Sequence, residues 1–426
     1  MVHPLVPCNP IVVHNSSTSK LHISDTNGNN INRENGTKVM TTLLGSDLLL
    51  KTDRITGKRV GIVANPASLD ASFHHIADRI QDQQGTTLVA LFGPQHGFNS
   101  DVQDNMIETD HTVDQTRGVP IFSLYSDTRK PLKNMLADLD LLVIDLQDIG
   151  TRVYTYVYTM ANCLRACRDS GLPVIVCDRP NPIGGIEVEG PLLDQAYASF
   201  VGQFPIPMRH GMTIGELALL FNEHFDIGAQ LEVIPMKNWQ RSMYYDVTGL
   251  PWMMPSPNIP TLDTAIVYPG SVLFEGTVLS EGRGTTRPFE ILGAPWVSAE
   301  RCAERANSAN LPGVYFRPLA FVPTFHKHKD NMCGGCQIHI TDRKTFRAVE
   351  SAVNLMIVFR QESISDFVWR KPPYEYEHTK TPIDILAGSA LLRSQIEANI
   401  SIQEISQSWK SSIEEFLQIR ARYLLY

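Results

Sequence analysis

Two polar side chains follow an apolar run at the point where a strand is expected to end. In "TTLVALFGPQHGF", Gln95 and His96 stand between Gly93 and Gly97. Glycines let the backbone turn and bring both side chains to the edge of a site. An imidazole can move a proton near neutral pH, whereas a glutamine amide cannot release one. The stretch therefore predicts a ligand-contacting loop, and leaves open whether it serves an enzyme or a binding protein.

Polar residues also follow four other apolar runs, "RVGIVAN", "PIFSLYS", "LLVIDLQD" and "LPVIVCDRP". Because helical stretches separate these continuous runs, they predict a parallel sheet that is covered on both faces. The carboxyl ends of parallel strands meet at one edge, where open α/β sheets bind their ligands. The polar residues expected at this edge are Asn65, Gln95, His96, Tyr125, Asp145, Asp148, Arg152, Asp178, Arg179 and Asn181.

Two helices are expected to support this edge. The segment "RVYTYVYTMANCLRACRDSG" has helical spacing and ends at Gly171. Thr213 and Glu216 have the spacing of a capping box at the start of a second helix. Arg209 and His210 come just before that helix, where they are either ligand contacts or ordinary loop residues. A further strand, "LEVIPMKNW", follows it.

The second half of the sequence has a different composition. The segment "MMPSPNIPTLDTAIVYPGSVLFEGTVLSEGRGTTRPFEILGAPW" is dense in Pro and Gly, and we expect a binding loop that carries Asn258, Glu275, Glu281 and Arg283. Beyond it, "GVYFRPLAFVPTF", "CQIHITD" and "FRAVESAVNLMIVF" predict a small α/β domain, and "IEEFLQIRARYLLY" predicts a closing helix. The expected organisation is an irregular tail over residues 1–37, a first domain over 38–250 and a second over 251–426.

Composition and motifs exclude several classes of function. The chain has 426 residues and a net charge of −8, and it contains no basic block of the kind that binds nucleic acid. It shows neither an apolar run long enough to span a membrane nor a signal peptide, which predicts a cytoplasmic protein. The G-x-G-x-x-G, G-x-S-x-G, HExxH and Walker motifs are absent from the sequence, which argues against nicotinamide cofactors, common esterases, zincins and nucleotide hydrolases.

A zinc site is a weaker alternative for "HKHKDNMCGGC". His326, His328, Cys333 and Cys336 are possible ligands, but they fall closer together than in most zinc fingers. We expect no metal here, and a tight turn at Gly334 and Gly335 instead. The remaining carboxylates, arginines, amides and tyrosines suit a polyhydroxylated ligand, since sugars are handled by paired carboxylates.

These segments together resemble the exo-β-N-acetylmuramidase family of glycoside hydrolases. The resemblance runs from about residue 45 to the end and rests on nine ordered blocks: "GIVANP", "FGPQHGF", "VIDLQDIGTRVYTY", "DRPNPIGG", "VEGP", "IPMRHGMTIGELA", "PSPNIPTLDTAIVYPG", "FEGTVLSEGRGTTRPF" and "GAPW". It implies a Rossmann-like domain, a smaller C-terminal α/β domain and an active site between them. It also implies release of N-acetylmuramic acid from the non-reducing end of peptidoglycan fragments, without a metal or organic cofactor.

One position departs from the family pattern, which usually reads Pro-Glu-His-Gly where this chain has Gln95. Since glutamine cannot act as a general acid, either another carboxylate supplies the proton, or the substrate's acetamido group assists, or hydrolysis is lost. The catalytic candidates are Glu281, Glu275, His96, Gln95 and Asp148. The substrate-binding candidates are Asn65, Glu108, Arg152, Tyr154, Asp178, Arg179, Asn181, Arg209, His210, Asn258 and Arg283. Two hypotheses follow: a glycosidase with a relocated acid, and an inactive amino-sugar-binding or regulatory protein.

Overall fold

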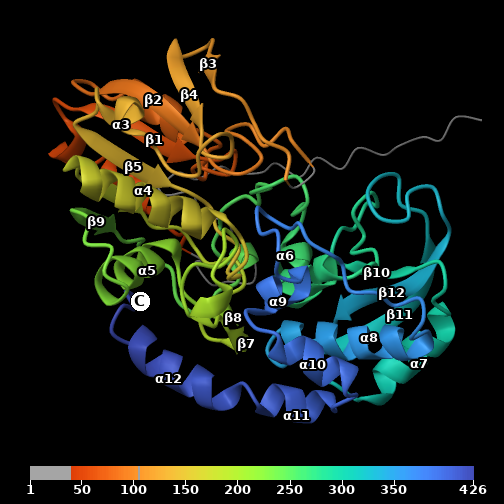
Figure 1. Ribbon diagram of the computed structural model, residues 1–426. Helices are drawn as coiled ribbons and strands as arrows, with labels where there is room; N and C mark the ends of the chain where they lie inside the picture. The colour runs from red at the N-terminus through yellow and green to blue at the C-terminus, as the bar shows by residue number, and fades with distance from the viewer. Residues whose placement is uncertain (1–39, 104–105) are drawn as a thin grey trace, which may run out of the picture. The chain divides into compact units, whose positions relative to one another are not determined.

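A seven-stranded sheet in the order β3-β4-β2-β1-β5-β6-β9 forms the first half of the fold (Figure 1). The structure is a computed structural model that describes residues 40–103 and 106–426, so the predicted tail over 1–37 lies outside the described residues. The strands are β1 (Arg59–Ala64), β2 (Thr87–Gly93), β3 (Thr112–Asp114), β4 (Val119–Ser123), β5 (Leu141–Asp145), β6 (Val174–Cys177) and β9 (Leu231–Ile234). Every neighbouring pair is parallel except β3 and β4. The predicted α/β class with a largely parallel sheet is confirmed.

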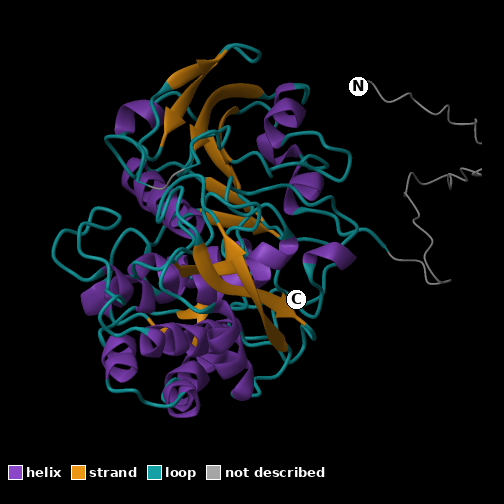
Figure 2. Cartoon of the chain, turned by 90° about the vertical axis from the view of Figure 1, so that its right-hand side faces the viewer, coloured by secondary structure: helices purple, strands orange, loops and turns teal. Residues whose placement is uncertain are grey.

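Helices cover both faces of this sheet (Figure 2). In β1, Val60 and Ile62 pack toward α1 (Gly45–Leu49) and α2 (Ile76–Gln81), whereas Val63 packs toward α3 (Lys133–Leu136), α4 (Tyr156–Ser170) and α5 (Ile214–Leu219). Successive side chains of a strand point to opposite faces, so a strand that is buried on both sides must be apolar throughout.

The two predicted supporting helices have the expected ends. Helix α4 ends at Gly171, which has the left-handed φ of 66° that glycine adopts at little cost. At the start of α5, the Thr213 hydroxyl accepts a hydrogen bond from the Glu216 N–H at 3.3 Å. The Glu216 carboxylate in turn accepts one from the Thr213 N–H at 3.0 Å, which completes the capping box. These caps fix the loop that leads from α4 into β6 and the segment that enters α5.

The second half contains a three-stranded antiparallel sheet in the order β10-β12-β11, and the strands and helix predicted there are confirmed. Its elements are α6 (Leu262–Ser271), β10 (Ile291–Ala294), α7 (Ala299–Ser308), β11 (Val314–Phe321), β12 (Cys333–Ile340), α8 (Ala348–Glu362), α9 (Pro382–Ala387), α10 (Leu391–Glu397), α11 (Ile402–Gln407) and α12 (Lys410–Arg420). A two-stranded sheet of β7 (Glu189–Leu192) and β8 (Pro207–Arg209) comes between β6 and β9 in the sequence. Residues Thr41–Tyr426 form one compact unit, and the domain boundary at residue 250 remains a prediction.

Two expectations for the second half are wrong. The Pro- and Gly-rich segment is not all loop, because it contains α6 with Pro269 inside the helix. Gly270 lets α6 lie against α8 so closely that a Cβ there would come 2.0 Å from the Ala348 carbonyl, and this packing offsets the cost of a helical proline. Gly334 and Gly335 do not form a turn but lie inside β12, where a Cβ on Gly335 would come 2.1 Å from the Leu292 carbonyl oxygen.

Two global features bear on the predicted class of protein. In the described part of the chain, no helix is both long and apolar enough to cross a membrane. The six cysteines described by the structure are all buried and form no disulfide.

Candidate active site

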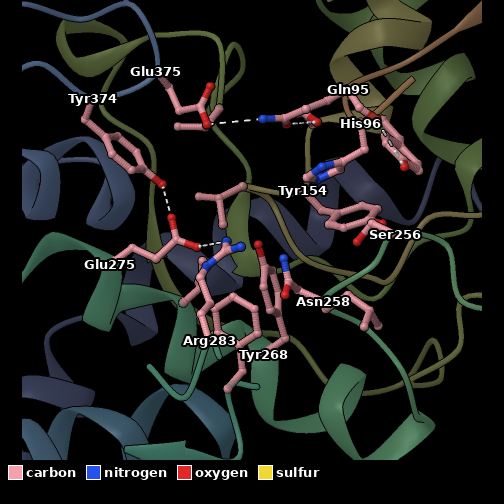
Figure 3. A pocket seen from close by; sticks show the side chains of 17 residues that line it. Gln95, His96, Tyr154, Ser256, Asn258, Tyr268, Glu275, Arg283, Tyr374 and Glu375 are labelled. Carbon is pink, nitrogen blue, oxygen red and sulfur yellow. Dashed lines mark hydrogen bonds and ion pairs between the residues drawn. The ribbon is translucent and has the colours of Figure 1, made fainter. Parts of the chain in front are cut away.

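A cavity lies where the loop after β2 meets segments of the second half (Figure 3). It encloses about 500 Å³ of space, part of which is open to solvent. Its polar and aromatic lining consists of Gln95, His96, Tyr154, Thr155, Tyr156, Ser256, Asn258, Tyr268, Glu275, Arg283, Phe289, Tyr374 and Glu375. The lining combines aromatic side chains with a few polar groups, as is usual for small-ligand pockets.

Glu375 is a buried carboxyl in this cavity that the sequence analysis did not identify. The Gln95 amide donates a hydrogen bond to Glu375 Oε1 at 3.2 Å, and the Tyr125 hydroxyl donates one to Oε2 at 2.8 Å. Burial raises the pKa of Glu375 to about 7, and the charge of Glu275 adds to this rise, although the hydrogen bonds from Tyr125 and Gln95 oppose it. Glu375 can therefore hold a proton near neutral pH, as a general acid must.

The orientation of the Gln95 amide is fixed from its other side. The Thr155 hydroxyl donates a hydrogen bond to Gln95 Oε1 at 2.7 Å, so the amide nitrogen faces Glu375. The neighbouring His96 also lines the cavity, and its Nδ1 lies 2.7 Å from the Val102 carbonyl oxygen. Gln95 thus occupies a place where a donor supports the Glu375 carboxyl and where a carboxylate would repel it.

A second carboxyl, Glu275, lies on the side of the cavity that Arg283 and Tyr374 form (Figure 3). It accepts hydrogen bonds from Arg283 Nη2 at 2.7 Å and from the Tyr374 hydroxyl at 2.6 Å. Arg283 Nη1 is buried and has no hydrogen-bond partner among the described residues. Burial lowers the pKa of Arg283, but the charges of Glu275 and Glu281 more than offset this, so the guanidinium stays positive. The cavity therefore offers one fixed cation with an unused donor.

Glu281, a leading candidate for the acid, does not line this cavity. It is fully buried and lies 2.7 Å from Lys327 Nζ, 3.1 Å from His326 Nδ1 and 3.3 Å from Arg283 Nε. Burial would raise the pKa of Glu281, but the charge of Lys327, aided by His326 and Arg283, holds it well below its usual range. Such a carboxyl remains ionised and is suited to positioning Arg283 rather than to donating a proton.

Glu375 and Tyr376 are the two central residues of a tight turn. The backbone N–H of Tyr374 donates to the carbonyl of Glu377 and the reverse bond also forms, each at 2.9 Å. Both central residues have left-handed φ angles, 45° for Glu375 and 67° for Tyr376. Turns of this kind strongly prefer Asn-Gly, and other residues there cost about 1–3 kcal/mol each. Glu375 lines the cavity, and strained residues of this kind cluster at active sites and ligand clamps.

Three of the four predicted ligand-binding arginines lie away from the cavity lining and are fully buried. Arg152 donates to the carbonyls of Pro191, Ile206 and Leu386 at 2.6, 3.0 and 2.7 Å. Arg179 holds Asp145 with two hydrogen bonds of 2.6 and 2.8 Å, and Arg209 donates to Glu189 at 2.8 Å. Most of their donors are used inside the fold, although Arg152 Nε and Arg209 Nε have no hydrogen-bond partner among the described residues. Only Arg283 of this group lines the cavity.

The other predicted edge residues lie at the carboxyl ends of the parallel strands, as expected, but they bind neighbouring loops instead of lining the cavity. Asp178 accepts hydrogen bonds from Thr213, Gly215 and Tyr426 at 2.7–2.8 Å. Asp148 accepts one from the Gly150 N–H at 2.7 Å and lies 3.6 Å from His210 Nε2. Asn65 donates to the Pro255 carbonyl at 3.2 Å, and Asn181 to the Met212 carbonyl at 2.9 Å. Glu108 lies at the surface beside Arg129 and Tyr376.

Among the residues that the structure describes, no group of three or more His, Cys, Asp or Glu side chains could hold a metal ion. His326 instead contacts Glu281, and His328 Nε2 lies 2.8 Å from the Val278 carbonyl oxygen. The arrangement that remains is a proton-bearing carboxyl, an ion-paired carboxyl and an arginine around one small cavity. This combination is suited to acid-assisted cleavage of a glycosidic bond.

Comparisons with known proteins agree with this chemistry. The N-terminal model of the exo-β-N-acetylmuramidase NamZ family matches residues 60–263, and its C-terminal model matches residues 266–426. The chain is 44% identical over 385 residues to the peptidoglycan β-N-acetylmuramidase NamZ of Bacillus subtilis. The aligned region covers 90% of this chain and 91% of that protein.

Two solved structures of DUF1343 family proteins from Bacteroides fragilis have the same fold. One is 34% identical with a TM-score of 0.82 and covers 92% of this chain and 100% of the other. The second is 30% identical with a TM-score of 0.71 and covers 90% and 99%. Because both family models match in order and together span nearly all of the described chain, the protein belongs to the exo-β-N-acetylmuramidase NamZ family.

Proposed function

We propose that this protein is a glycosidase that removes a terminal N-acetylmuramic acid, or a similar acidic 2-acetamido sugar, from peptidoglycan-type fragments. The observation that carries the proposal is the buried Glu375 carboxyl, whose raised pKa of about 7 lets a large share of the molecules keep this proton at neutral pH in the cavity. Family membership supports the same reaction class, since a B. subtilis relative is named as a peptidoglycan β-N-acetylmuramidase.

Glu375 is the proton donor in this proposal. Its proton passes to the glycosidic oxygen as the bond from that oxygen to the anomeric carbon breaks, and the leaving sugar departs as a neutral alcohol. The positive charge that develops on the ring is stabilised by Glu275 or by the carbonyl of the 2-acetamido group. Water then adds to the anomeric carbon and its released proton restores the acid. Gln95 and Tyr125 hold Glu375 in place throughout.

Arg283 supplies selectivity for an acidic sugar. Its buried Nη1 has no hydrogen-bond partner among the described residues, and a carboxylate on the sugar ring can occupy that donor. A hydrogen bond to a charged group contributes about 1.5–3 kcal/mol. The protein should therefore bind N-acetylmuramic acid at least tenfold more tightly than N-acetylglucosamine, which lacks the lactyl carboxylate, as measured by isothermal titration calorimetry.

Substitution of Glu375 by glutamine tests the proposed acid. The Glu375→Gln variant should lose about 10²–10⁴ in kcat for a muramyl disaccharide, the scale of general acid–base help, while it still binds the sugar. The loss in kcat on an aryl muramide should be much smaller, because a phenolate can leave without being protonated. Glu290→Gln, outside the cavity lining, is the control.

Two results would contradict this assignment. Equal rates for wild type and Glu375→Gln on the disaccharide would exclude Glu375 as the acid. Tight binding of the sugar by the wild type with no turnover of either substrate would favour the alternative of an inactive amino-sugar-binding protein. The sequence observation behind that alternative is Gln95, which stands where the family pattern usually has glutamate.

A further inference from the structure

A partly exposed aromatic and charged cluster adjoins Glu375. Tyr376, which is 44% exposed, packs edge-on against Tyr125 with ring centroids 5.8 Å apart. Tyr125 is the residue whose hydroxyl holds Glu375. The Arg129 guanidinium lies 3.9 Å from the Tyr376 ring centre and donates a hydrogen bond to Glu108 at 3.0 Å. We call Glu108, Arg129, Phe200 and Tyr376 the outer cluster.

The outer cluster adjoins the residues that hold the proposed acid. A general acid faces the glycosidic oxygen, so the leaving sugar is expected close to Glu375. Phe200 precedes Val201, which lines the cavity. The centres of the Phe200 and Tyr125 rings lie 5.6 Å apart. The cavity and the outer cluster are therefore neighbouring surfaces joined at Tyr125 and Glu375.

The composition of the outer cluster suits a pyranose ring. Tyr376 and Phe200 offer apolar ring surface, while Arg129 and Glu108 offer a planar donor and an acceptor for hydroxyl and amide groups. The Tyr376 hydroxyl donates to Glu108 at 3.1 Å, which holds the polar and apolar parts together. The left-handed φ of 67° at Tyr376 is costly for a side chain that stays partly in solvent, which points to a use outside folding.

We propose that the outer cluster is the subsite for the leaving sugar, a 2-acetamido pyranose on the reducing side of the cleaved bond. This inference rests on the proposed glycosidase function and adds the residues that recognise the second sugar. The sugar ring packs on Tyr376, and its polar groups bind Arg129 and Glu108. The subsite makes the protein select fragments in which the terminal sugar is joined to another amino sugar rather than to a small alcohol.

Two substrates separate this subsite from the rest of the active site. One is the disaccharide of N-acetylmuramic acid and N-acetylglucosamine, and the other is N-acetylmuramyl fluoride, whose leaving group has no ring. Tyr376→Ala should lower kcat/KM for the disaccharide by about tenfold, equivalent to about 1.4 kcal/mol of lost contact, and leave kcat/KM for the fluoride within about twofold. Arg129→Lys should act in the same direction, since it removes the planar fork. Tyr376→Phe, which keeps the ring, should retain most of the disaccharide rate.

Binding gives a second measurement that does not depend on turnover. In the Glu375→Gln background, the further change Tyr376→Ala should weaken disaccharide binding by about tenfold and leave the affinity for N-acetylmuramic acid unchanged. An equal loss on disaccharide and fluoride would overturn the subsite and show that Tyr376 acts through Tyr125 on the acid. Unchanged kcat/KM values of Tyr376→Ala on both substrates would also overturn it while leaving the proposed function intact. Hydrolysis of neither substrate by the wild type would instead refute the proposed function, and the subsite with it.

Discussion

At the scale of single residues, the side chain at position 95 is in direct contact with the Glu375 carboxyl. A hydrogen bond of 3.2 Å joins the two side chains, and Thr155 fixes the amide so that its nitrogen is the partner. Two carboxyls at such a distance cannot both ionise, so they share one proton and titrate as a pair. With Gln95 in place, Glu375 titrates as a single acid that a neutral donor supports.

The pH dependence of Gln95→Glu tests this pairing. For the wild type, kcat/KM for the disaccharide should fall as pH rises through about 7, where Glu375 loses its proton. In Gln95→Glu the added carboxyl should move this alkaline limb to higher pH by about one unit or more, and the lost neutral donor should lower the maximum rate. Gln95→Leu, which removes the donor without adding charge, should not show the upward shift.

An unmoved alkaline limb in Gln95→Glu would show that position 95 does not govern the acid. If the wild type lacks activity and Gln95→Glu creates it, Gln95 marks lost catalysis, and the relocated-acid proposal fails.

At the scale of elements, sequence patterns identified the strands and helices better than the roles of their end residues. Apolar runs and capping residues predicted β1, β2, β5, β6, α4 and α5, because both faces of the sheet are buried and helix caps are local. Polar residues at strand ends look the same whether they bind a ligand or a neighbouring carbonyl. Arg152 is an example, since its partners at Pro191 and Leu386 are brought to it only by the tertiary fold.

Glu375 was out of reach of sequence reasoning for a related reason. It lies in "PPYEYEHTK", which has neither an apolar period nor a strand before it. Its partners Gln95 and Tyr125 lie 280 and 250 residues earlier in the chain. The one local signal was a glutamate between two tyrosines after a Pro-Pro pair, and this became informative only when the structure showed the turn and its left-handed φ angles.

The strained turn makes a prediction about stability. At the left-handed position of Tyr376, alanine pays a steric cost of about 1–2 kcal/mol that glycine avoids. Tyr376→Gly should therefore have a free energy of unfolding about 1 kcal/mol higher than Tyr376→Ala, as measured with urea. At the exposed Glu414 in α12, the same pair should show the opposite order, because glycine is worse than alanine in a helix. Equal stabilities of the two Tyr376 variants would mean that the turn holds no such strain.

At the scale of the whole molecule, the site combines parts of both halves of the sequence. Gln95 and His96 come from the loop after β2, and Glu275, Arg283 and Glu375 come from segments beyond residue 250. Two buried carboxyls have raised pKa values, Asp178 before the predicted domain boundary and Glu375 after it. Burial raises the pKa of each to about 7. The stability of the folded chain therefore depends on the protonation of both.

The sign of this dependence follows from the direction of the shifts. A carboxyl whose pKa is higher in the folded state than in the unfolded state contributes stability below its ordinary pKa, and this contribution is lost as pH rises through the folded value. Between pH 5 and pH 8 the wild type should therefore lose unfolding free energy relative to Glu375→Gln, by at most on the order of 3 kcal/mol. Urea unfolding of both proteins at each pH gives the difference, and Asp178→Asn serves as a parallel case. A difference that stays constant with pH would contradict the raised pKa of Glu375.

The left-handed turn at Glu375 and Tyr376 also has a consequence for the engineering of this family. A search for thermostable variants that scores folding alone will favour Asn-Gly at these two positions, because that pair adopts the turn without strain. Such a variant would trade catalysis for robustness, as is common where an active site is held in an unfavourable conformation. It would keep Arg283 and Glu275 in the cavity but lose Tyr376, so it would still bind a terminal acidic sugar while holding the longer natural fragments less tightly.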